Sequence, residues 1–166
     1  YFNFLKKSNK KNKSIYIKKN LRNLKNNTFD TILYLDVIEH IKNDKKEIIN
    51  AYKLLRKNGT LIICVPAFQF LYSLYDKKIG HFRRYNKNDF KNLLRICKIK
   101  YFDLRYFDFI GFCLIYLSNH LVKNNLNNFS LKIKLWNFLI PISRILDFFL
   151  MKYFFGKSLL VKIKKI

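Results

Sequence analysis

The stretch that decides the fold runs Phe29-Asp30-Thr31-Ile32-Leu33-Tyr34-Leu35-Asp36-Val37-Ile38-Glu39-His40-Ile41. Within it, residues 31–37 form an apolar run rich in β-branched side chains, which predicts a strand buried on both faces. Residues 43–57 follow with apolar side chains at helical spacing, and Asn58-Gly59 supplies a stop signal for that helix. Residues 60–65 predict a second buried strand. Strand, helix and strand with tight connections make one βαβ unit, so we expect a parallel sheet.

Further elements are predicted around this unit. Short β-branched or alternating runs indicate strands at 15–17, 100–107 and 158–163. A second amphipathic helix is predicted over Asn86–Cys97, with Asn86 or Asn88 as its N-cap. The connection 67–85 is long and rich in Tyr, Phe and His, which is typical of a loop that carries function.

The last third of the chain is unusually apolar. Phe109–Leu117 is continuous but far shorter than the roughly 20 residues of a membrane span. Residues 129–155 predict a helix that Pro141 kinks or divides. We expect a core or lid helix, and keep peripheral attachment to anionic lipid as the alternative. Its predicted apolar face consists of Leu135, Phe138, Leu139, Ile142, Ile145, Leu146 and Phe149.

Composition bounds the class of protein. The chain has 166 residues, of which 50% are apolar and 17% aromatic, and this excludes an intrinsically disordered chain despite a net charge of +24. The charge fits a polyanion such as nucleic acid or a membrane surface, but it also fits a compositional bias toward Lys and Asn. We favour the bias, because nothing resembles a nucleic-acid-binding module. Three cysteines, Cys64, Cys97 and Cys113, fit no zinc spacing and indicate a reducing, cytoplasmic compartment.

The amino-terminal part is strongly basic. The first 25 residues carry nine Lys or Arg and no acidic residue, and they lack the long apolar core of a signal peptide. We therefore divide the chain into a basic segment, 1–14, and a domain part, 15–166, with a helical insertion at about 109–156. The sequence reads as though it begins inside a domain.

Glycine placement excludes several nucleotide sites. Gly59, Gly80, Gly111 and Gly156 lie far apart, so neither a P-loop nor a G-x-G-x-x-G loop can be built from this chain.

The order of motifs resembles the second half of class I S-adenosylmethionine-dependent methyltransferases of the type 11/12-like kind. In that family an FD pair precedes the fourth strand, LEH follows it, and a leucine-rich word ending in Gly precedes the fifth strand. Here these words read Phe29-Asp30, Ile38-Glu39-His40 and Leu54-Leu55-Arg56-Lys57-Asn58-Gly59. The later Leu71-Tyr72-Ser73 and Gly80-His81-Phe82-Arg83-Arg84-Tyr85 are similar to a subgroup acting on small-molecule and cell-envelope acceptors.

The resemblance implies an α/β, Rossmann-like three-layer sandwich with strand order 3-2-1-4-5-7-6 and an antiparallel last strand. On this mapping residues 15–19 are strand 3, and the predicted strands after residue 30 are strands 4 to 7. Strands 1 and 2 and the glycine-rich cofactor loop have no counterpart, so we expect the C-terminal portion of the domain, an incomplete sandwich. Strand edges that lose their neighbours should make this portion poorly stable or prone to aggregate.

The resemblance also implies a cofactor site for S-adenosyl-L-methionine. Leu35, Asp36 and Val37 lie where the family lines the methionine part of the cofactor, and Asn20 and Leu21 lie near its adenine position. Asp36 could instead be an ordinary turn residue, and Asn20 an ordinary loop residue.

Asp36, Glu39 and His40 form a D-x-x-E-H array. Some relatives with E-x-x-E-H hold a divalent metal there, usually with a second distant histidine. Glu-His at this point also occurs without metal, so we predict a packing role for His40 and no metal site.

The loop after the second buried strand offers the acceptor side. We expect His81 to take a proton from the methyl acceptor, and Arg83, Arg84 and Tyr85 to bind the acceptor. The alternative is a structural ion-pair cluster with Asp76 or Asp89. His120, in an apolar helical stretch, is expected to be structural.

The sequence therefore predicts methyl transfer to a small-molecule, lipid or saccharide acceptor, by a chain that is inactive alone. We expect a cytoplasmic protein, with peripheral contact at the inner face of a membrane through 129–155, and no specific nucleic-acid partner. The alternative is a non-catalytic basic module that binds nucleic acid or an anionic membrane.

Overall fold

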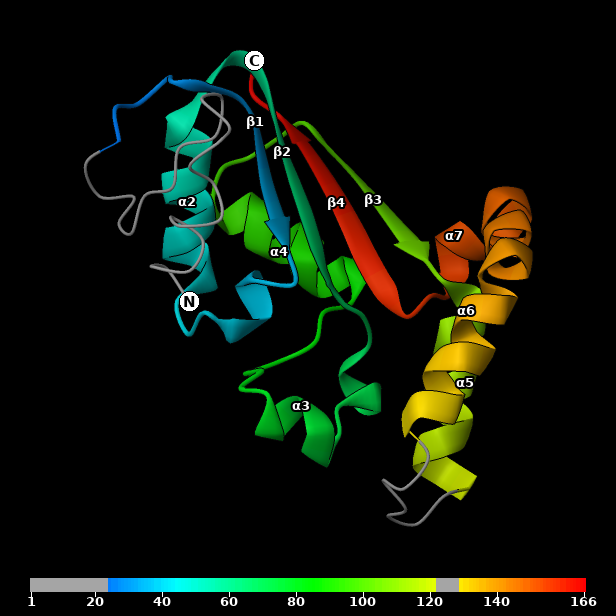
Figure 1. The fold of residues 1–166 in the computed structure, drawn as a ribbon. Coiled ribbons are helices and arrows are strands. Elements are labelled where there is room, and N and C mark those ends of the chain that lie inside the picture. Colours follow the sequence, from blue (N-terminus) through cyan, green and yellow to red (C-terminus); the bar gives the residue numbers. More distant parts are fainter. Residues whose placement is uncertain (1–23, 122–128) are drawn as a thin grey trace, which may run out of the picture.

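The described residues form a four-stranded open sheet (Figure 1). The computed structural model describes residues 24–121 and 129–166. Its strands are β1 (Phe29–Leu35), β2 (Leu55–Pro66), β3 (Phe102–Phe107) and β4 (Ser158–Lys164), in the order β1-β2-β4-β3. β1 and β2 are parallel, whereas β4 is antiparallel to both of its neighbours. The predicted parallel pair and antiparallel last strand are confirmed; the strand predicted at 15–19 lies outside the described residues.

The first βαβ unit differs from its prediction at one junction. Helix α2 (Asp44–Leu54) begins after Asn43, whose side chain accepts a hydrogen bond from the Lys46 amide at 3.1 Å. The predicted helix end at Asn58-Gly59 is wrong, because α2 ends at Leu54 and β2 begins at Leu55.

Gly59 instead serves a close backbone approach. The Asn58 amide donates to the Lys165 carbonyl at 2.7 Å, and the Lys165 amide donates to the Gly59 carbonyl at 3.0 Å. A Cβ on Gly59 would lie 2.9 Å from the Arg56 carbonyl and 3.1 Å from that of Phe29. Glycine is therefore required by strand packing here.

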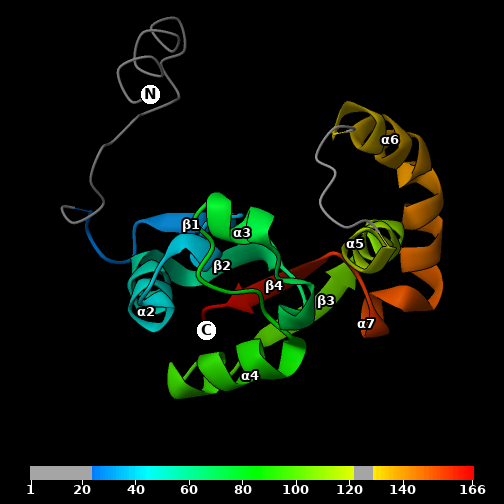
Figure 2. The same cartoon turned by 90° about the horizontal axis from the view of Figure 1, so that it is seen from below.

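One face of the sheet is buried under helices. Helix α2 and helix α4 (Lys87–Ile96) lie on the same face (Figure 2). Fully buried side chains alternate along the paired parts of β2 and β4: Leu61, Ile63, Val65, Leu159, Val161 and Ile163. Asn86 rather than Asn88 caps α4, in a capping box with Asp89.

The other face of the sheet is open among the described residues. Leu33 and Leu35 of β1 are 58% and 56% exposed, and Leu160 of β4 is 36% exposed. The prediction that residues 31–37 are buried on both faces is therefore wrong for the described part of the chain. The predicted incomplete α/β sandwich is confirmed, with one helical layer described.

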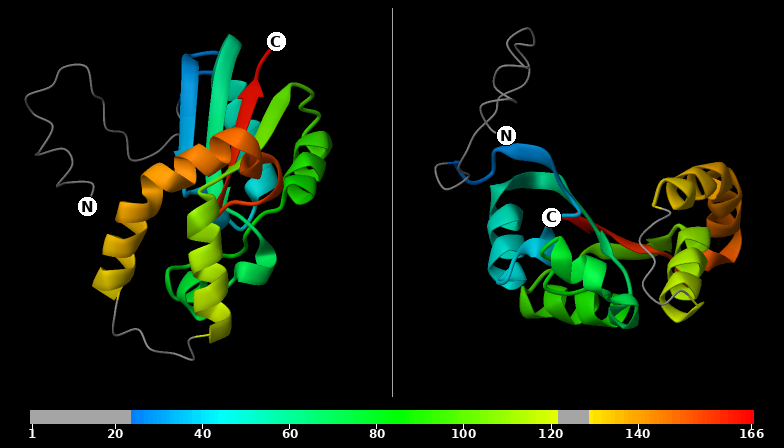
Figure 3. Two further views of the ribbon diagram at one scale, coloured as in Figure 1. Left: turned by 90° about the vertical axis from the view of Figure 1, so that its right-hand side faces the viewer. Right: turned by 60° about the horizontal axis from the view of Figure 1, so that its bottom comes forward.

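Between β3 and β4 the chain forms a helical excursion. Helix α5 (Phe109–Leu121) and helix α6 (Phe129–Leu146) pack side by side (Figure 3), followed by a π-helical turn, η4 (Asp147–Met151), and the short α7 (Lys152–Phe154). Pro141 lies inside α6 and does not divide it. Among the described residues, no helix has the length and apolarity that a membrane crossing requires.

The apolar face predicted for α6 points away from the core. Phe138 is 77% exposed and Ile145 59%, whereas Ser143 is only 3% exposed. The Ser143 hydroxyl accepts from the Ile110 amide at 3.2 Å, and Asp147 accepts from the Asp108 amide at 2.7 Å. These hydrogen bonds hold the polar side of α6 against α5. Of the expected core or lid helix, the core role is therefore wrong, and the lid role stays a prediction.

Candidate functional site

Two connections meet beyond the carboxyl ends of β1 and β2. The first is the turn after β1, which contains η1 (Ile38–His40); the second is the loop after β2, which contains η2 (Gln69–Leu71) and α3 (Leu74–Lys78). In open α/β sheets this edge is where ligands bind. The predicted site residues that the structure describes lie in these two connections, except Leu35, which is the last residue of β1.

Asp36 begins the first connection in a left-handed conformation. Its φ is 52°, and its amide donates to the Cys64 carbonyl on β2 at 3.0 Å. Leu35, Asp36 and Val37 all have exposed side chains. This part of the predicted cofactor site is therefore open to a ligand. Asn20 and Leu21 lie outside the described residues.

Glu39 is the unusual residue of the turn. Its side chain is 0% exposed, and neither carboxylate oxygen has a hydrogen-bond partner among the described residues. Burial raises the pKa of Glu39 to about 7, and the nearby charge of Asp36 adds to this effect.

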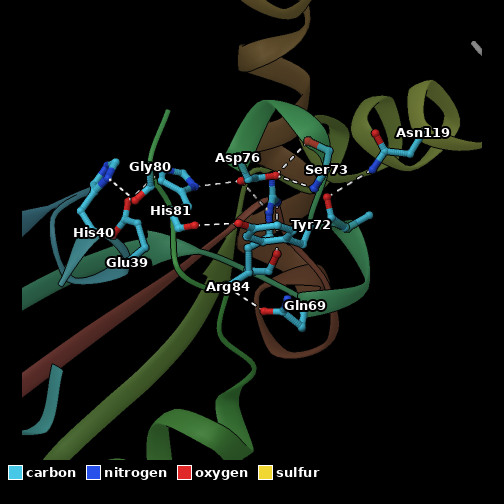
Figure 4. Close-up of polar contacts among 12 residues, drawn as sticks. Glu39, His40, Gln69, Tyr72, Ser73, Asp76, Gly80, His81, Arg84 and Asn119 are labelled. Carbon is cyan, nitrogen blue, oxygen red and sulfur yellow. Dashed lines mark hydrogen bonds and ion pairs between the residues drawn. The ribbon is translucent and has the colours of Figure 1, made fainter. Parts of the chain in front are cut away.

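Asp76 is the centre of the second connection (Figure 4). It is 1% exposed and accepts hydrogen bonds from the amide and the hydroxyl of Ser73, both at 2.9 Å. Arg84 donates from Nε to Oδ1 and from Nη2 to Oδ2, each at 3.0 Å. Burial alone would raise the pKa of Asp76, but the hydrogen bonds and charge of Arg84 outweigh it and hold the pKa below its usual range.

His81 links Asp76 to Glu39. Its Nδ1 lies 2.8 Å from Asp76 Oδ1, and its Nε2 lies 3.8 Å from Glu39 Oε1. An ionised carboxylate can only accept, so Nδ1 carries the proton and Nε2 of the neutral ring keeps a lone pair. The His40 ring packs edge-on against His81, with centroids 4.6 Å apart.

Backbone contacts hold the two connections together. The Phe82 amide donates to the Glu39 carbonyl at 2.8 Å, and His40 Nδ1 lies 3.1 Å from the Gly80 carbonyl oxygen. Gly80, directly before His81, has a φ of +87°, a left-handed conformation that favours glycine.

The residues predicted to bind the acceptor are largely engaged within the protein. Arg84 has an 8% exposed side chain in its pair with Asp76, as the structural alternative proposed. Arg83 pairs with Asp44 at 2.6 Å and keeps 31% side-chain exposure. The Tyr85 hydroxyl donates to Asp44 at 2.9 Å, and burial and the charge of Asp44 raise the pKa of Tyr85.

Sequence reasoning missed two parts of this site. Asp44, which receives both Arg83 and Tyr85, carried no signal beyond its place at the start of a helix. The approach of His81 to Glu39 and His40 also went unpredicted, because it depends on how the loop folds. Asp89 caps α4 instead of pairing with the loop, and the side chain of His120 lies outside the described part.

The comparisons with known proteins agree with this architecture. Residues 2–63 match a family model described as a methyltransferase domain. No curated protein matches the chain significantly.

Several solved structures share the fold. One is a SAM-dependent methyltransferase from Thermotoga maritima, described as a possible histamine N-methyltransferase; it is 18% identical, with a TM-score of 0.53 over 89% of this chain and 60% of that one. A SAM-dependent methyltransferase from Archaeoglobus fulgidus gives 17% identity and a TM-score of 0.52 over 87% of this chain and 63% of that one.

A third structure carries bound ligands. It is Haemonchus contortus phosphoethanolamine N-methyltransferase 2 in complex with phosphomonomethylethanolamine and S-adenosylhomocysteine, which is 16% identical, with a TM-score of 0.51 over 86% of this chain and 35% of that one. The chain thus spans at most 63% of the length of these three proteins. The fold is shared with these SAM-dependent methyltransferases, as the resemblance in the sequence predicts.

Proposed function

We propose that this chain contributes cofactor-binding and acceptor-binding residues to an S-adenosyl-L-methionine-dependent methyltransferase. The observation that carries the proposal is the open edge beyond β1, where Leu35, Asp36 and Val37 are exposed in a fold shared with these enzymes. The carboxylate of Asp36 would accept a hydrogen bond from the amino group of the cofactor. Asn20 and Leu21 would contribute to the adenine side.

The glycine-rich loop that binds S-adenosylmethionine in this family has no counterpart in these 166 residues. We propose that such a loop is supplied from outside them and that the chain alone is inactive. The limited share of the related structures that the chain covers, 60% and 63%, supports this.

His81 is proposed to assist the transfer. When bound, S-adenosyl-L-methionine would supply the methyl group to a lone pair of the acceptor, and its sulfur would keep the electrons of the carbon–sulfur bond. The proton of the acceptor hydroxyl or amine passes to His81 Nε2. Asp76, at 2.8 Å from Nδ1, holds the ring in the tautomer that this step needs.

The acceptor is proposed to be a small molecule, or a lipid- or saccharide-linked one. Arg83 keeps more exposure than Arg84 or Tyr85, so it is the member of this trio best placed to meet an anionic group. The Haemonchus contortus enzyme is in complex with phosphomonomethylethanolamine, a small amine that carries such an anionic group. Arg84 and Tyr85 would then shape the pocket by fixing the loop.

Peripheral membrane contact is a second proposal, and a separate observation favours it. Phe138, Phe148 and Phe149 on α6 and η4 are 77%, 74% and 68% exposed, on a chain with a net charge of +24. Exposed aromatic side chains with basic surroundings suit an anionic lipid surface. The corresponding location is the cytoplasm, at the inner face of a membrane.

A thermal-shift titration of the complete gene product separates these proposals. S-adenosylmethionine and S-adenosylhomocysteine should each raise Tm by several degrees, since a ligand that binds only the folded state stabilises it. Anionic vesicles should bind in a sedimentation assay, and the double variant Phe148→Ser/Phe149→Ser should bind them more weakly. Binding to DNA or vesicles without any response to either cofactor form would instead support a non-catalytic basic module.

A further inference from the structure

A group of three side chains beside the proposed acceptor site has the composition of a metal centre. One ligand atom from each of Glu39, His40 and His81 lies within 4.8 Å of the others. Asp36, the first residue of the D-x-x-E-H array, is not part of the group, and His81 from the second connection takes the third place.

Both imidazoles are oriented by acceptors on Nδ1. His81 donates from Nδ1 to Asp76 Oδ1 at 2.8 Å, and His40 Nδ1 is 3.1 Å from the Gly80 carbonyl oxygen. Metal-binding histidines usually donate their second ring nitrogen to a carboxylate or a backbone carbonyl in this way. Both Nε2 lone pairs are consequently left for another partner.

Glu39 supplies an independent observation. It is completely buried, and neither of its carboxylate oxygens has a hydrogen-bond partner in the described part of the chain. Burying a carboxylate without compensation costs several kcal/mol. A cation between Glu39 and the two imidazoles would remove that cost.

The distances suit an ion. Glu39 Oε1 and His81 Nε2 are 3.8 Å apart. A tetrahedral ion with bonds of about 2.1 Å holds its ligand atoms about 3.4 Å apart. The surrounding contacts, with Arg84 and Ser73 on Asp76 and the Phe82 amide on the Glu39 carbonyl, keep the group in place.

We propose that Glu39, His40 and His81 bind one divalent first-row transition-metal ion, such as Zn²⁺. Two imidazoles with one carboxylate favour such an ion over Mg²⁺ or Ca²⁺, which prefer oxygen ligands alone. Three protein ligands leave at least one coordination position for water or an acceptor atom. This revises the expectation that the chain has no metal site.

The ion would change the role proposed for His81. Nε2 cannot hold a metal and accept a proton at the same time. In the loaded protein the ion would polarise the bound acceptor atom, and proton acceptance by Nε2 belongs to the metal-free protein. The metal site itself does not depend on the proposed methyl transfer, because binding can be measured without any cofactor.

The test is calorimetric titration of the chelator-treated, complete gene product with ZnCl₂ and CoCl₂. We expect one ion per chain, and a visible absorption band with Co²⁺ from four or five ligands. Glu39→Gln and His40→Asn should each weaken binding at least tenfold. The control Asp103→Asn changes an exposed carboxylate that pairs with Arg105, and it should leave the affinity unchanged.

His40 is exposed, so its substitution should leave the fold intact, which circular dichroism checks. No binding of either ion to the wild type, or binding by the His40→Asn and Glu39→Gln variants as tight as that of the wild type, would overturn the proposal. Tighter binding of Mg²⁺ than of Zn²⁺ would overturn it as well. S-adenosylhomocysteine binding measured on the same samples distinguishes failure of the metal site from failure of the proposed function.

Discussion

Arg84 and Asp76 form a buried two-point ion pair, with Nε to Oδ1 and Nη2 to Oδ2 both at 3.0 Å. The pair closes the loop after β2, and Arg84 also donates to the Ala67 carbonyl at 3.3 Å, where the loop begins. Because Asp76 also receives His81, the same carboxylate fixes both the shape of the loop and the ring of the candidate catalytic residue.

Asp76→Asn should destabilise the protein by about 3–5 kcal/mol, because it leaves the buried Arg84 guanidinium without a counter-charge. Urea unfolding followed by circular dichroism measures this. Asp103→Asn, which breaks an exposed pair with Arg105, should cost less than about 1 kcal/mol. Equal losses in both variants would contradict the structural role of the Asp76–Arg84 pair.

Glu39→Gln should stabilise the metal-free protein at pH 8, on the order of 2–3 kcal/mol. The pKa of Glu39 is raised to about 7 in the folded state, so wild-type stability falls as pH rises from about 4.5 through 7. The advantage of the variant should therefore be small at pH 5 and full at pH 8. Thermal unfolding in the presence of a chelator checks it, and an advantage that shrinks as pH rises would be inconsistent with the buried charge.

Leu33→Thr combined with Leu160→Thr should reduce self-association of the 166-residue chain. Both leucines are exposed on the sheet, and β1 is an edge strand of the described sheet. Sedimentation velocity should show more monomer than for the wild type. Leu61→Thr is the matched control. Leu61 is fully buried, so this change should lower the free energy of unfolding by about 2–4 kcal/mol and increase association. An unchanged monomer fraction in the double variant would argue against the open face as its cause.

Asp147→Ala should loosen the helical excursion. Asp147 accepts from the amides of Asp108 and Phe109 at 2.7 and 3.1 Å and so satisfies the start of α5. Loss of such a cap costs about 0.5–2 kcal/mol. Limited proteolysis should cut within 109–156 several times faster, while cleavage in β1 and β2 stays unchanged. Uniformly faster cleavage would show that the excursion is not held separately.

The sheet was predictable because its signals are local. The β-branched runs at 31–37 and 60–65 and the run at 158–163 marked three strands, and the order of motifs indicated the antiparallel last one. The end of α2 was mispredicted because a glycine needed for close packing against β1 looks the same in sequence as a helix stop. The facing of α6 was mispredicted because two polar residues, Ser143 and Asp147, bind the start of α5.

The candidate site was predictable by position and not by pairing. The strand end at residues 35–37 and the motif Gly80–Tyr85 correctly predicted which segments lie at this edge of the sheet. Asp76 binds both Arg84 and His81, and Glu39 is buried with no hydrogen-bond partner among the described residues; both follow from the three-dimensional course of the loop. The spacing of these residues in the sequence does not determine the distances between their side chains.

The most direct test of the central claim is calorimetric titration of the complete gene product with S-adenosylhomocysteine, comparing Asp36→Ala with Asp30→Ala. Asp36 follows β1 at its carboxyl end, whereas Asp30 lies near the opposite end and pairs with Arg56 on the surface. The account predicts micromolar binding by the wild type and by Asp30→Ala, with at least a tenfold loss in Asp36→Ala. Absence of binding to the wild type, or equal affinity in both variants, would contradict it.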